Sequence, residues 1–206
     1  PPMVVVESGS MMHDEEGSVG AIDPGDLILV MNKNRVDVVT FVEATEVGNE
    51  NYGHESHGSP GDVIIFSKNG GLDTPVIHRA LLEVVQNGSG WDVPGTTLRN
   101  VETVTWTLDI ECSSFHGDYN LRIEDWEPNH SGFLTSGDNN AGGCMIDQSG
   151  VSSNGPASGM RDSSNEPVEE VKDEWIVGIA SSEIPWIGSI KLVTSGNWEE
   201  VTPRSW

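Results

Sequence analysis

A serine, a histidine and two aspartates stand out as residues that together could cleave a peptide bond. Ser10 lies in "ESGSM", directly after a run of β-forming residues. His78 lies in "TPVIHRALLEV", and Asp138 and Asp147 lie in "GDNNAGGCMIDQ". Acyl transfer to a hydroxyl needs a base within hydrogen-bond reach, an acid that orients the base, and donors for the oxyanion. The chain offers each residue type, in the order serine, histidine, acid.

Each of these residues also has an interpretation that involves no chemistry. The segment around Ser10 reads equally as a strand end followed by a turn, and His78 as a histidine of the core. Asp138 fits a tight turn in which its side chain bonds its own backbone, and Asp147 fits a solvated loop. In an extended strand, residues two apart face the same side, so Ser8 would lie beside Ser10 as a second donor.

The elements that must position these residues are predicted to be strands, because the apolar segments are short, rich in β-branched residues and separated by Gly, Pro, Asn and Asp. Within the segment of His78, Arg79 faces the opposite side and is expected to pair with one of the many acids. The best short helix candidate is 167–175. The predicted strands are 3–8, 26–31, 36–44, 62–67, 75–85, 101–111, 131–137, 174–184 and 188–193.

This pattern predicts a mainly β protein in which 1–206 form a single catalytic region. The polar, glycine-rich stretches 46–60 and 148–166 are expected to be surface loops. The stretch 87–129 carries three of the seven tryptophans and at least one predicted strand. We therefore expect a smaller β-subdomain there, inserted between strands of the core.

The charge of the chain excludes some partners. Acidic residues number 33 against 10 basic ones, for a net charge of −23, and they are scattered along the chain. Such a field repels phosphate backbones, which argues against nucleic-acid binding, and it predicts a solvated acidic surface. No apolar run reaches the roughly 18 residues that a membrane span needs. Because "PPMVVV" opens directly on a predicted strand, we expect that an N-terminal membrane anchor has been removed.

Two further groups of residues leave alternatives open. Cys112 and Cys144 allow one disulfide, but a single pair does not define a redox compartment. The "HESH" segment, His54 to His57, has a spacing that could bind a metal, yet it lies in a polar loop with no third ligand in view. We therefore expect no metal and no cofactor.

The order of the motifs is more informative than any of them alone. "SGSM", "GDVIIF", "VIHR" and "GFLTSGDNN…DQ" follow one another as in type I signal peptidases of the archaeal and endoplasmic-reticulum branch, which the sequence resembles between Val5 and Asp147. The segment "EWIVGIASSEIPWIGSIKL" resembles the family's closing strand. The resemblance implies a membrane-bound serine endopeptidase that removes signal peptides from exported proteins on the extracytoplasmic side of the cell membrane. It also implies a signal-peptidase-like antiparallel β catalytic core with a variable smaller domain.

The resemblance assigns a role to each candidate residue. Ser10 matches the nucleophile, whose backbone N–H and the Ser8 hydroxyl would bind the oxyanion. His78 stands where this branch has its base. Asp147 is the better match to the acid that orients the histidine, and Asp138 to the acid that shapes the site, although the long spacing between them leaves the assignment open. An insertion after "SGSM" lengthens the loop that follows the nucleophile.

Two other classes of function compete with this interpretation. Serine–lysine peptidases share the general fold, but none of Lys33, Lys68, Lys172 and Lys191 occupies the position of the base. A non-catalytic or degenerate peptide-binding extracellular β-domain is the main alternative. For an active enzyme, signal peptides are the expected partners, and an extended substrate would add to an exposed strand, "VVVES" or "TPVIH".

Overall fold

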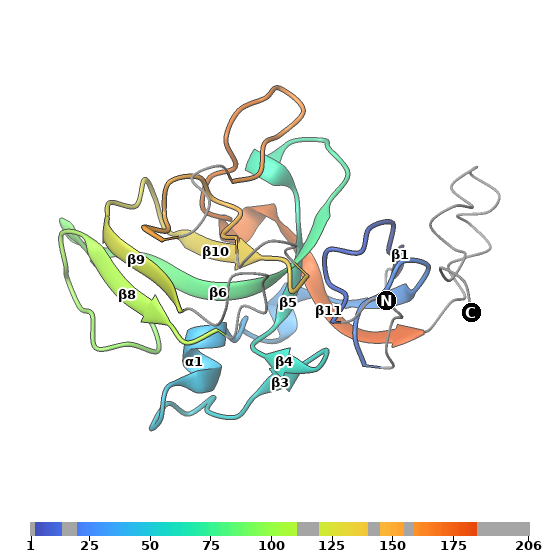
Figure 1. Ribbon diagram of the computed structural model, residues 1–206, viewed down its shortest axis with the longest axis horizontal. Helices are drawn as coiled ribbons and strands as arrows, with labels where there is room; N and C mark the ends of the chain where they lie inside the picture. The colour runs from blue at the N-terminus through green and yellow to red at the C-terminus, as the bar shows by residue number, and fades with distance from the viewer. Residues whose placement is uncertain (1–2, 14–19, 111–119, 140–144, 155–158, 185–206) are drawn as a thin grey trace.

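The main sheet has seven antiparallel strands, in a computed structural model that describes residues 3–13, 20–110, 120–139, 145–154 and 159–184 (Figure 1). The strand order is β1-β2-β11-β5-β6-β10, and β7 pairs with the far end of β6. The prediction of a mainly β protein is confirmed. The bounds of these strands are β1 (Met3–Val5), β2 (Leu27–Met31), β5 (Val63–Phe66), β6 (Val76–Asn87), β7 (Gly90–Asp92), β10 (Gly132–Ser136) and β11 (Ile176–Ile184).

Strand β6 is the centre of the fold because both of its faces are buried. Ala80 packs into one apolar cluster with residues of β5 and β11, whereas Leu81 and Leu82 belong to a second cluster. Strands covered on both sides read as continuous apolar runs rather than as an alternation, as "ALL" at Ala80–Leu82 does. Its pairing with β5 sets Ile64 opposite His78. His78 and Arg79 of β6 are thereby held in the interior, 6% and 2% exposed.

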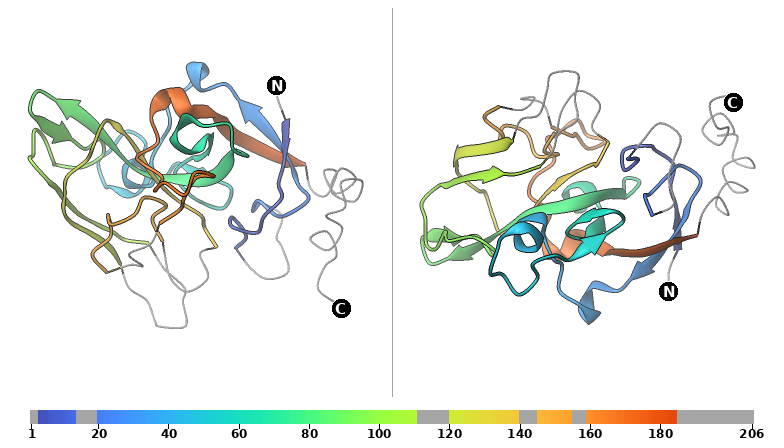
Figure 2. Two further views of the ribbon diagram at one scale, coloured as in Figure 1. Left: turned by 90° about the horizontal axis from the view of Figure 1, so that it is seen from above. Right: turned by 60° about the horizontal axis from the view of Figure 1, so that its bottom comes forward.

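A second, two-stranded sheet is formed by β8 (Val104–Leu108) and β9 (Leu121–Trp126) within the stretch expected to be an inserted subdomain. It lies at the end of the molecule opposite β1 (Figures 1 and 2). Val104 and Ile123 belong to the same buried cluster as Leu81 and Leu82. The stretch therefore shares a hydrophobic core with the main sheet.

The strand predicted at 36–44 is wrong, because the only α-helix among the described residues, α1 (Phe41–Thr45), lies there. Thr40 caps this helix: its hydroxyl accepts a hydrogen bond from the backbone N–H of Glu43, whose carboxylate accepts from the backbone N–H of Thr40. Such a capping box satisfies backbone donors at the first turn. This local gain, with Phe41 and Val42 buried, outweighs the β-propensity of the segment.

The helix predicted at 167–175 is likewise wrong in its larger part. Only a short 3-10 turn, η3 (Asp173–Trp175), forms there. Val171 exchanges both backbone hydrogen bonds with Phe133, each 2.9 Å, and this pairing holds the segment extended beside β10. The strand predicted at 188–193 lies outside the described residues.

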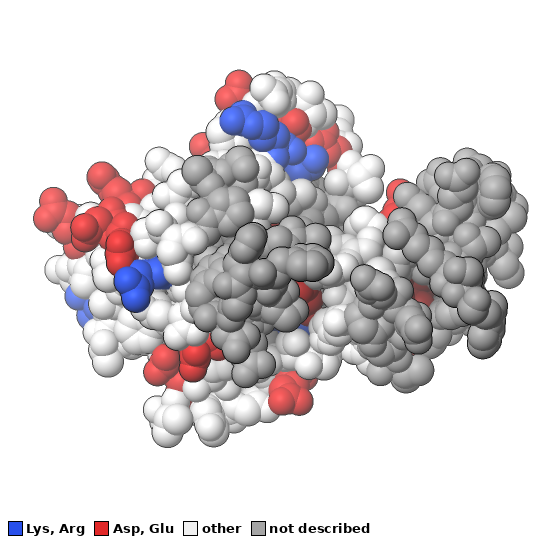
Figure 3. Space-filling view, in the orientation of Figure 1, with Lys and Arg blue, Asp and Glu red and all other residues white. Residues whose placement is uncertain are grey.

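The two predicted loop regions contain little regular structure. The stretch 46–60 carries only a short hairpin, formed by β3 (Glu55–Ser56) and β4 (Ser59–Pro60), and the described part of 148–166 carries no strand or helix of its own. The other short 3-10 turns are η1 (Lys33–Arg35) and η2 (Lys68–Gly70). Acidic side chains are spread over several parts of the face in Figure 3, with fewer basic ones. Within the described part of the chain, no helix is long and apolar enough to cross a membrane.

Candidate active site

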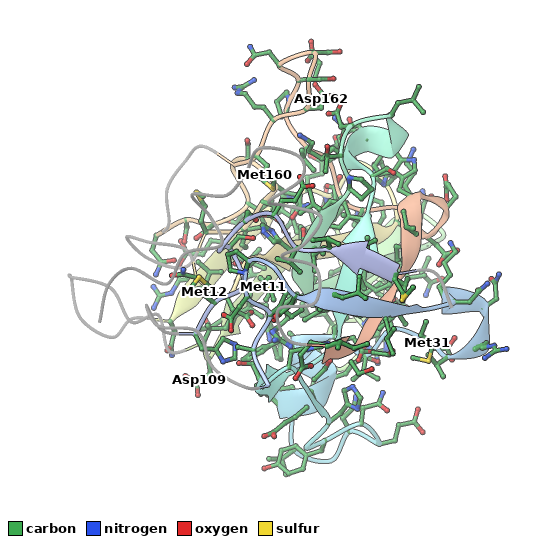
Figure 4. The ribbon with its side chains drawn as sticks, turned by 90° about the vertical axis from the view of Figure 1, so that its right-hand side faces the viewer. Met11, Met12, Met31, Asp109, Met160 and Asp162 are labelled. Carbon is green, nitrogen blue, oxygen red and sulfur yellow. The ribbon has the colours of Figure 1, made fainter. Side chains whose placement is uncertain are left out.

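Ser10 lies in a turn just beyond β1, not in a continuing strand. Val6 still pairs with the chain before β2, accepting from Gly25 and donating to Asp26, each at 3.0 Å. The backbone then turns, and the N–H of Met12 donates to the carbonyl of Gly9. Met11 is buried in an apolar cluster and anchors the turn; Figure 4 labels it and Met12.

His78 joins Ser10 to Asp147 by two hydrogen bonds. Its Nε2 lies 3.0 Å from Ser10 Oγ, and its Nδ1 lies 2.7 Å from Asp147 Oδ2. An ionised carboxylate only accepts hydrogen bonds, so the proton of the neutral ring belongs on Nδ1 and Nε2 is free to accept from the serine hydroxyl. The three side chains have the arrangement that a hydroxyl nucleophile, a general base and an orienting acid require.

Asp147 is held rigidly although it lies beyond the end of β10. Its backbone N–H donates to the carbonyl of Thr135 at 2.8 Å, and the Thr135 hydroxyl donates to Asp147 Oδ2 at 2.6 Å. The neighbouring Gln148 accepts from the Thr135 backbone N–H at 3.0 Å. With 1% of its surface exposed, Asp147 is not a solvated loop acid. Sequence reasoning missed Thr135 and Gln148, because their role depends on the pairing of β10 with β6.

Asp138 contacts Arg79, the residue after His78, and does not bond His78. Arg79 Nε donates to Asp138 Oδ1 at 2.8 Å and Nη2 to Oδ2 at 2.6 Å, a bidentate pair. The expected pairing of Arg79 with an acid is confirmed. The same guanidinium donates through Nη1 to the carbonyls of Ser59 and Gly61, at 3.1 and 2.6 Å, which ties the β3–β4 hairpin to β6.

A histidine that sequence reasoning missed completes the surroundings of Asp138. His13 Nε2 lies 3.0 Å from Asp138 Oδ2. Burial opposes the ionisation of Asp138, but hydrogen bonds from His13 and Arg79 and the charge of Arg79 outweigh it, so the pKa of Asp138 is lowered. The hydrogen bond to Asp138 raises the pKa of His13, against an opposing effect of burial. The only sequence signal that could have pointed to His13 was the length of the loop after Ser10.

The peptide that carries the nucleophile is tied to the residue after Asp138. The backbone N–H of Asn139 donates to the Ser10 carbonyl at 2.8 Å, and its side-chain amide donates to the Gly9 carbonyl at 2.9 Å. On the other side, Ser8 Oγ lies 3.3 Å from Ser10 Oγ. The Ser8 hydroxyl is thus close enough to the nucleophile to serve as a second polar group for a bound carbonyl oxygen.

The "HESH" histidines do not converge. His54 bonds Asp62 at 2.8 Å, whereas His57 lies 3.3 Å from the carbonyl of Ala180 and 3.4 Å from Glu183. Among the described residues no group of three or more His, Cys, Asp or Glu side chains is arranged to hold a metal ion. Cys112 and Cys144 lie outside the described residues, so the disulfide stays a prediction.

The three described lysines are all engaged elsewhere. Lys33 pairs with Asp173 and Lys68 with Asp73, and Lys172 lies over the ring of Trp175. Lys191 lies outside the described residues. Among the described residues, therefore, the base that contacts Ser10 is a histidine.

Comparison of the chain with family models, with curated proteins and with solved structures gives no match.

Proposed function

We propose that the chain is a serine endopeptidase that removes N-terminal signal peptides from exported proteins on the extracytoplasmic side of the cell membrane. The observation that carries this proposal is the unbroken hydrogen-bonded chain from Ser10 Oγ through His78 to the buried Asp147. The order of the sequence motifs, which resembles that of signal peptidases, supports the substrate class.

The reaction is an acyl transfer in two halves. His78 Nε2 takes the proton of the Ser10 hydroxyl as Oγ attacks the scissile carbonyl, and then gives the proton to the leaving amine. The acyl group remains on Ser10 as an ester. A water molecule, deprotonated by His78, attacks that ester, and the proton returns to Ser10 as the acid product leaves.

Charge is stabilised at two places during these steps, on the imidazole and on the oxyanion. Asp147 stabilises the imidazolium that forms on His78, and the Thr135 hydroxyl keeps the carboxylate in place. The Ser10 backbone N–H and the Ser8 hydroxyl face the developing oxyanion. In other hydrolases a single oxyanion donor contributes about 3 kcal/mol to transition-state stabilisation.

The substrate is an extended segment with small side chains near the scissile bond. Among the described residues strand β1 pairs only with β2 and is an edge strand. It leads directly into the Ser10 turn, so an extended peptide can add beside it. With a net charge of −23 the domain is not drawn to an anionic membrane surface. Attachment to the membrane is therefore assigned to an anchor outside the described residues.

Cleavage of a preprotein in detergent micelles tests the proposal. We expect the wild type to cut once, after the signal peptide, as read by mass spectrometry of the products. Ser10→Ala and His78→Ala should each lower kcat by at least about 10³-fold. Ser163→Ala, a change in an exposed loop, is the matched control and should leave kcat unchanged.

Two results would contradict the proposal. Undiminished cleavage by Ser10→Ala would show that Ser10 is not the nucleophile. Tight binding of the signal peptide by the wild type with no cleavage, in a preparation that retains its membrane anchor, would favour the peptide-binding domain instead.

A further inference from the structure

The segment that carries Ser10 and the strand that carries His78 are joined by contacts outside the Ser10–His78–Asp147 chain. Three residues after Ser10, His13 bonds Asp138. Asp138 bonds Arg79, which follows His78 on β6. A path of side chains thus runs from the loop after the serine, through one carboxylate, to the strand of the histidine.

These side-chain contacts are also linked by hydrogen bonds to the backbone at Ser10. Asn139, next to Asp138, donates to the carbonyls of Gly9 and Ser10. A shift of Asp138 therefore also shifts the two hydrogen bonds that hold the Ser10 backbone. Arg79 is fixed independently, because its side chain is 3% exposed and donates to carbonyls of the β3–β4 hairpin. His13 is the most exposed of the three side chains, with 28% of its side chain exposed against 12% for Asp138.

We propose that His13 is a positioning residue, which acts through Asp138 to hold the Ser10 turn at hydrogen-bond distance from His78. This inference deepens the proposed function and rests on Ser10 as its nucleophile. Loss of the His13 contact removes the side-chain hydrogen bond between the segment that carries Ser10 and Asp138. The Ser10 hydroxyl then spends less time in line with His78 Nε2, and errors of about 1 Å in such geometry can lower rates by up to 10²-fold.

The charge of His13 distinguishes this role from a neutral packing role. The groups that act on His13 are Asp138, which favours its imidazolium, Arg79, which opposes it, and Asp23, which favours it. Because the pKa of His13 is raised, the ion pair with Asp138 is complete at lower pH and is lost as pH rises through that pKa. The turn is then held less firmly, so the reactivity of Ser10 should have a component that falls with rising pH.

The test measures the rate at which Ser10 reacts with a small fluorophosphonate, together with kcat and KM for a preprotein. His13→Ala is expected to lower the fluorophosphonate rate and kcat about tenfold, with KM within about twofold. His13→Gln keeps a neutral donor. Its fluorophosphonate rate should be about threefold higher than that of His13→Ala. Unlike the rate of the wild type, this rate should have no component that falls with rising pH. His130→Ala, which removes a histidine–carboxylate pair near Trp175, is the matched control and should leave the rate unchanged.

Failure of the His13 inference can be distinguished from failure of the proposed function. A wild type that reacts with the fluorophosphonate but does not cut preproteins would contradict the substrate class and leave the His13 measurement intact. An unchanged fluorophosphonate rate in His13→Ala, in protein whose melting temperature matches the wild type, would overturn the inference. So would a His13→Gln profile that keeps the pH component of the wild type.

Discussion

Two carboxylates follow β10, and they serve neighbouring residues of β6 in different ways. Asp147 bonds His78, and Asp138 bonds Arg79. Because successive side chains of a strand point to opposite sides, one acid cannot serve both partners, and each partner needs an acid of its own. Asp147 thus orients a base and Asp138 anchors a loop, although the two acids lie within ten residues of each other in the sequence.

The two acids also differ in the charge of their partners. A guanidinium keeps its charge over the ordinary pH range, so the Asp138 carboxylate faces a charged partner with little solvent around it. In the proposed reaction His78 gains a charge when it takes the serine proton. Removing Asp147 should therefore appear mainly in the rate, whereas removing Asp138 should lower the stability of the fold as well as the rate.

The largest expected effect is on the rate of Asp147→Asn. An asparagine can donate to Nδ1 and favours the wrong tautomer of His78, and it cannot stabilise the imidazolium, so kcat should fall by about 10³- to 10⁴-fold. Single-turnover cleavage of a preprotein measures this. Asp109→Asn, a change at an exposed aspartate, is the control. A fall in kcat of less than tenfold would show that Asp147 does not orient the base.

For Asp138→Asn the expected change is in the free energy of unfolding. Removal of one partner leaves the guanidinium of Arg79 buried without its counter-charge, which should cost about 3 kcal/mol at pH 7 in urea titrations. The folded-state pKa of Asp138 is lowered, so its contribution is present above its unfolded pKa and is lost as pH falls through the folded one. The difference in the free energy of unfolding between the variant and the wild type should therefore become smaller at acidic pH. A gap that is constant with pH would contradict the ion-pair explanation.

A third carboxyl, that of Glu83 on β6, extends this comparison, because acids rather than cations dominate its surroundings. Burial, and then the charges of Glu43, Asp173 and Asp37, raise the pKa of Glu83 to about 7. The folded state thus holds this proton more tightly than the unfolded state, and stability falls as pH rises from the unfolded pKa to about 7. Glu83→Gln should be more stable than the wild type at pH 8 by about 2 kcal/mol, after allowance for solvent screening, and similar to it near pH 4. Equal urea midpoints at both pH values would refute this.

Much of the β-structure could be predicted because it depends on local composition. The apolar runs of β5 and β6 and the segment of β10 lie where β-branched residues and flanking turns indicated strands. The prediction was wrong where a specific local contact overrode propensity, as in the capping box that starts α1. It was also wrong at 167–175, where the backbone pairing of Val171 with Phe133 favours an extended segment over a helix.

The candidate site, too, could be predicted only in part. The sequence by itself determined the residue types and their order: a serine after a β-run, a histidine within an apolar strand, and two acids in a later loop. Only the tertiary structure decided that Asp147 contacts His78, that Asp138 contacts Arg79, and that His13 joins the second pair. These contacts connect residues 59 to 125 positions apart. They depend on strand register and loop path, and no pattern of neighbouring residues encodes either one by itself.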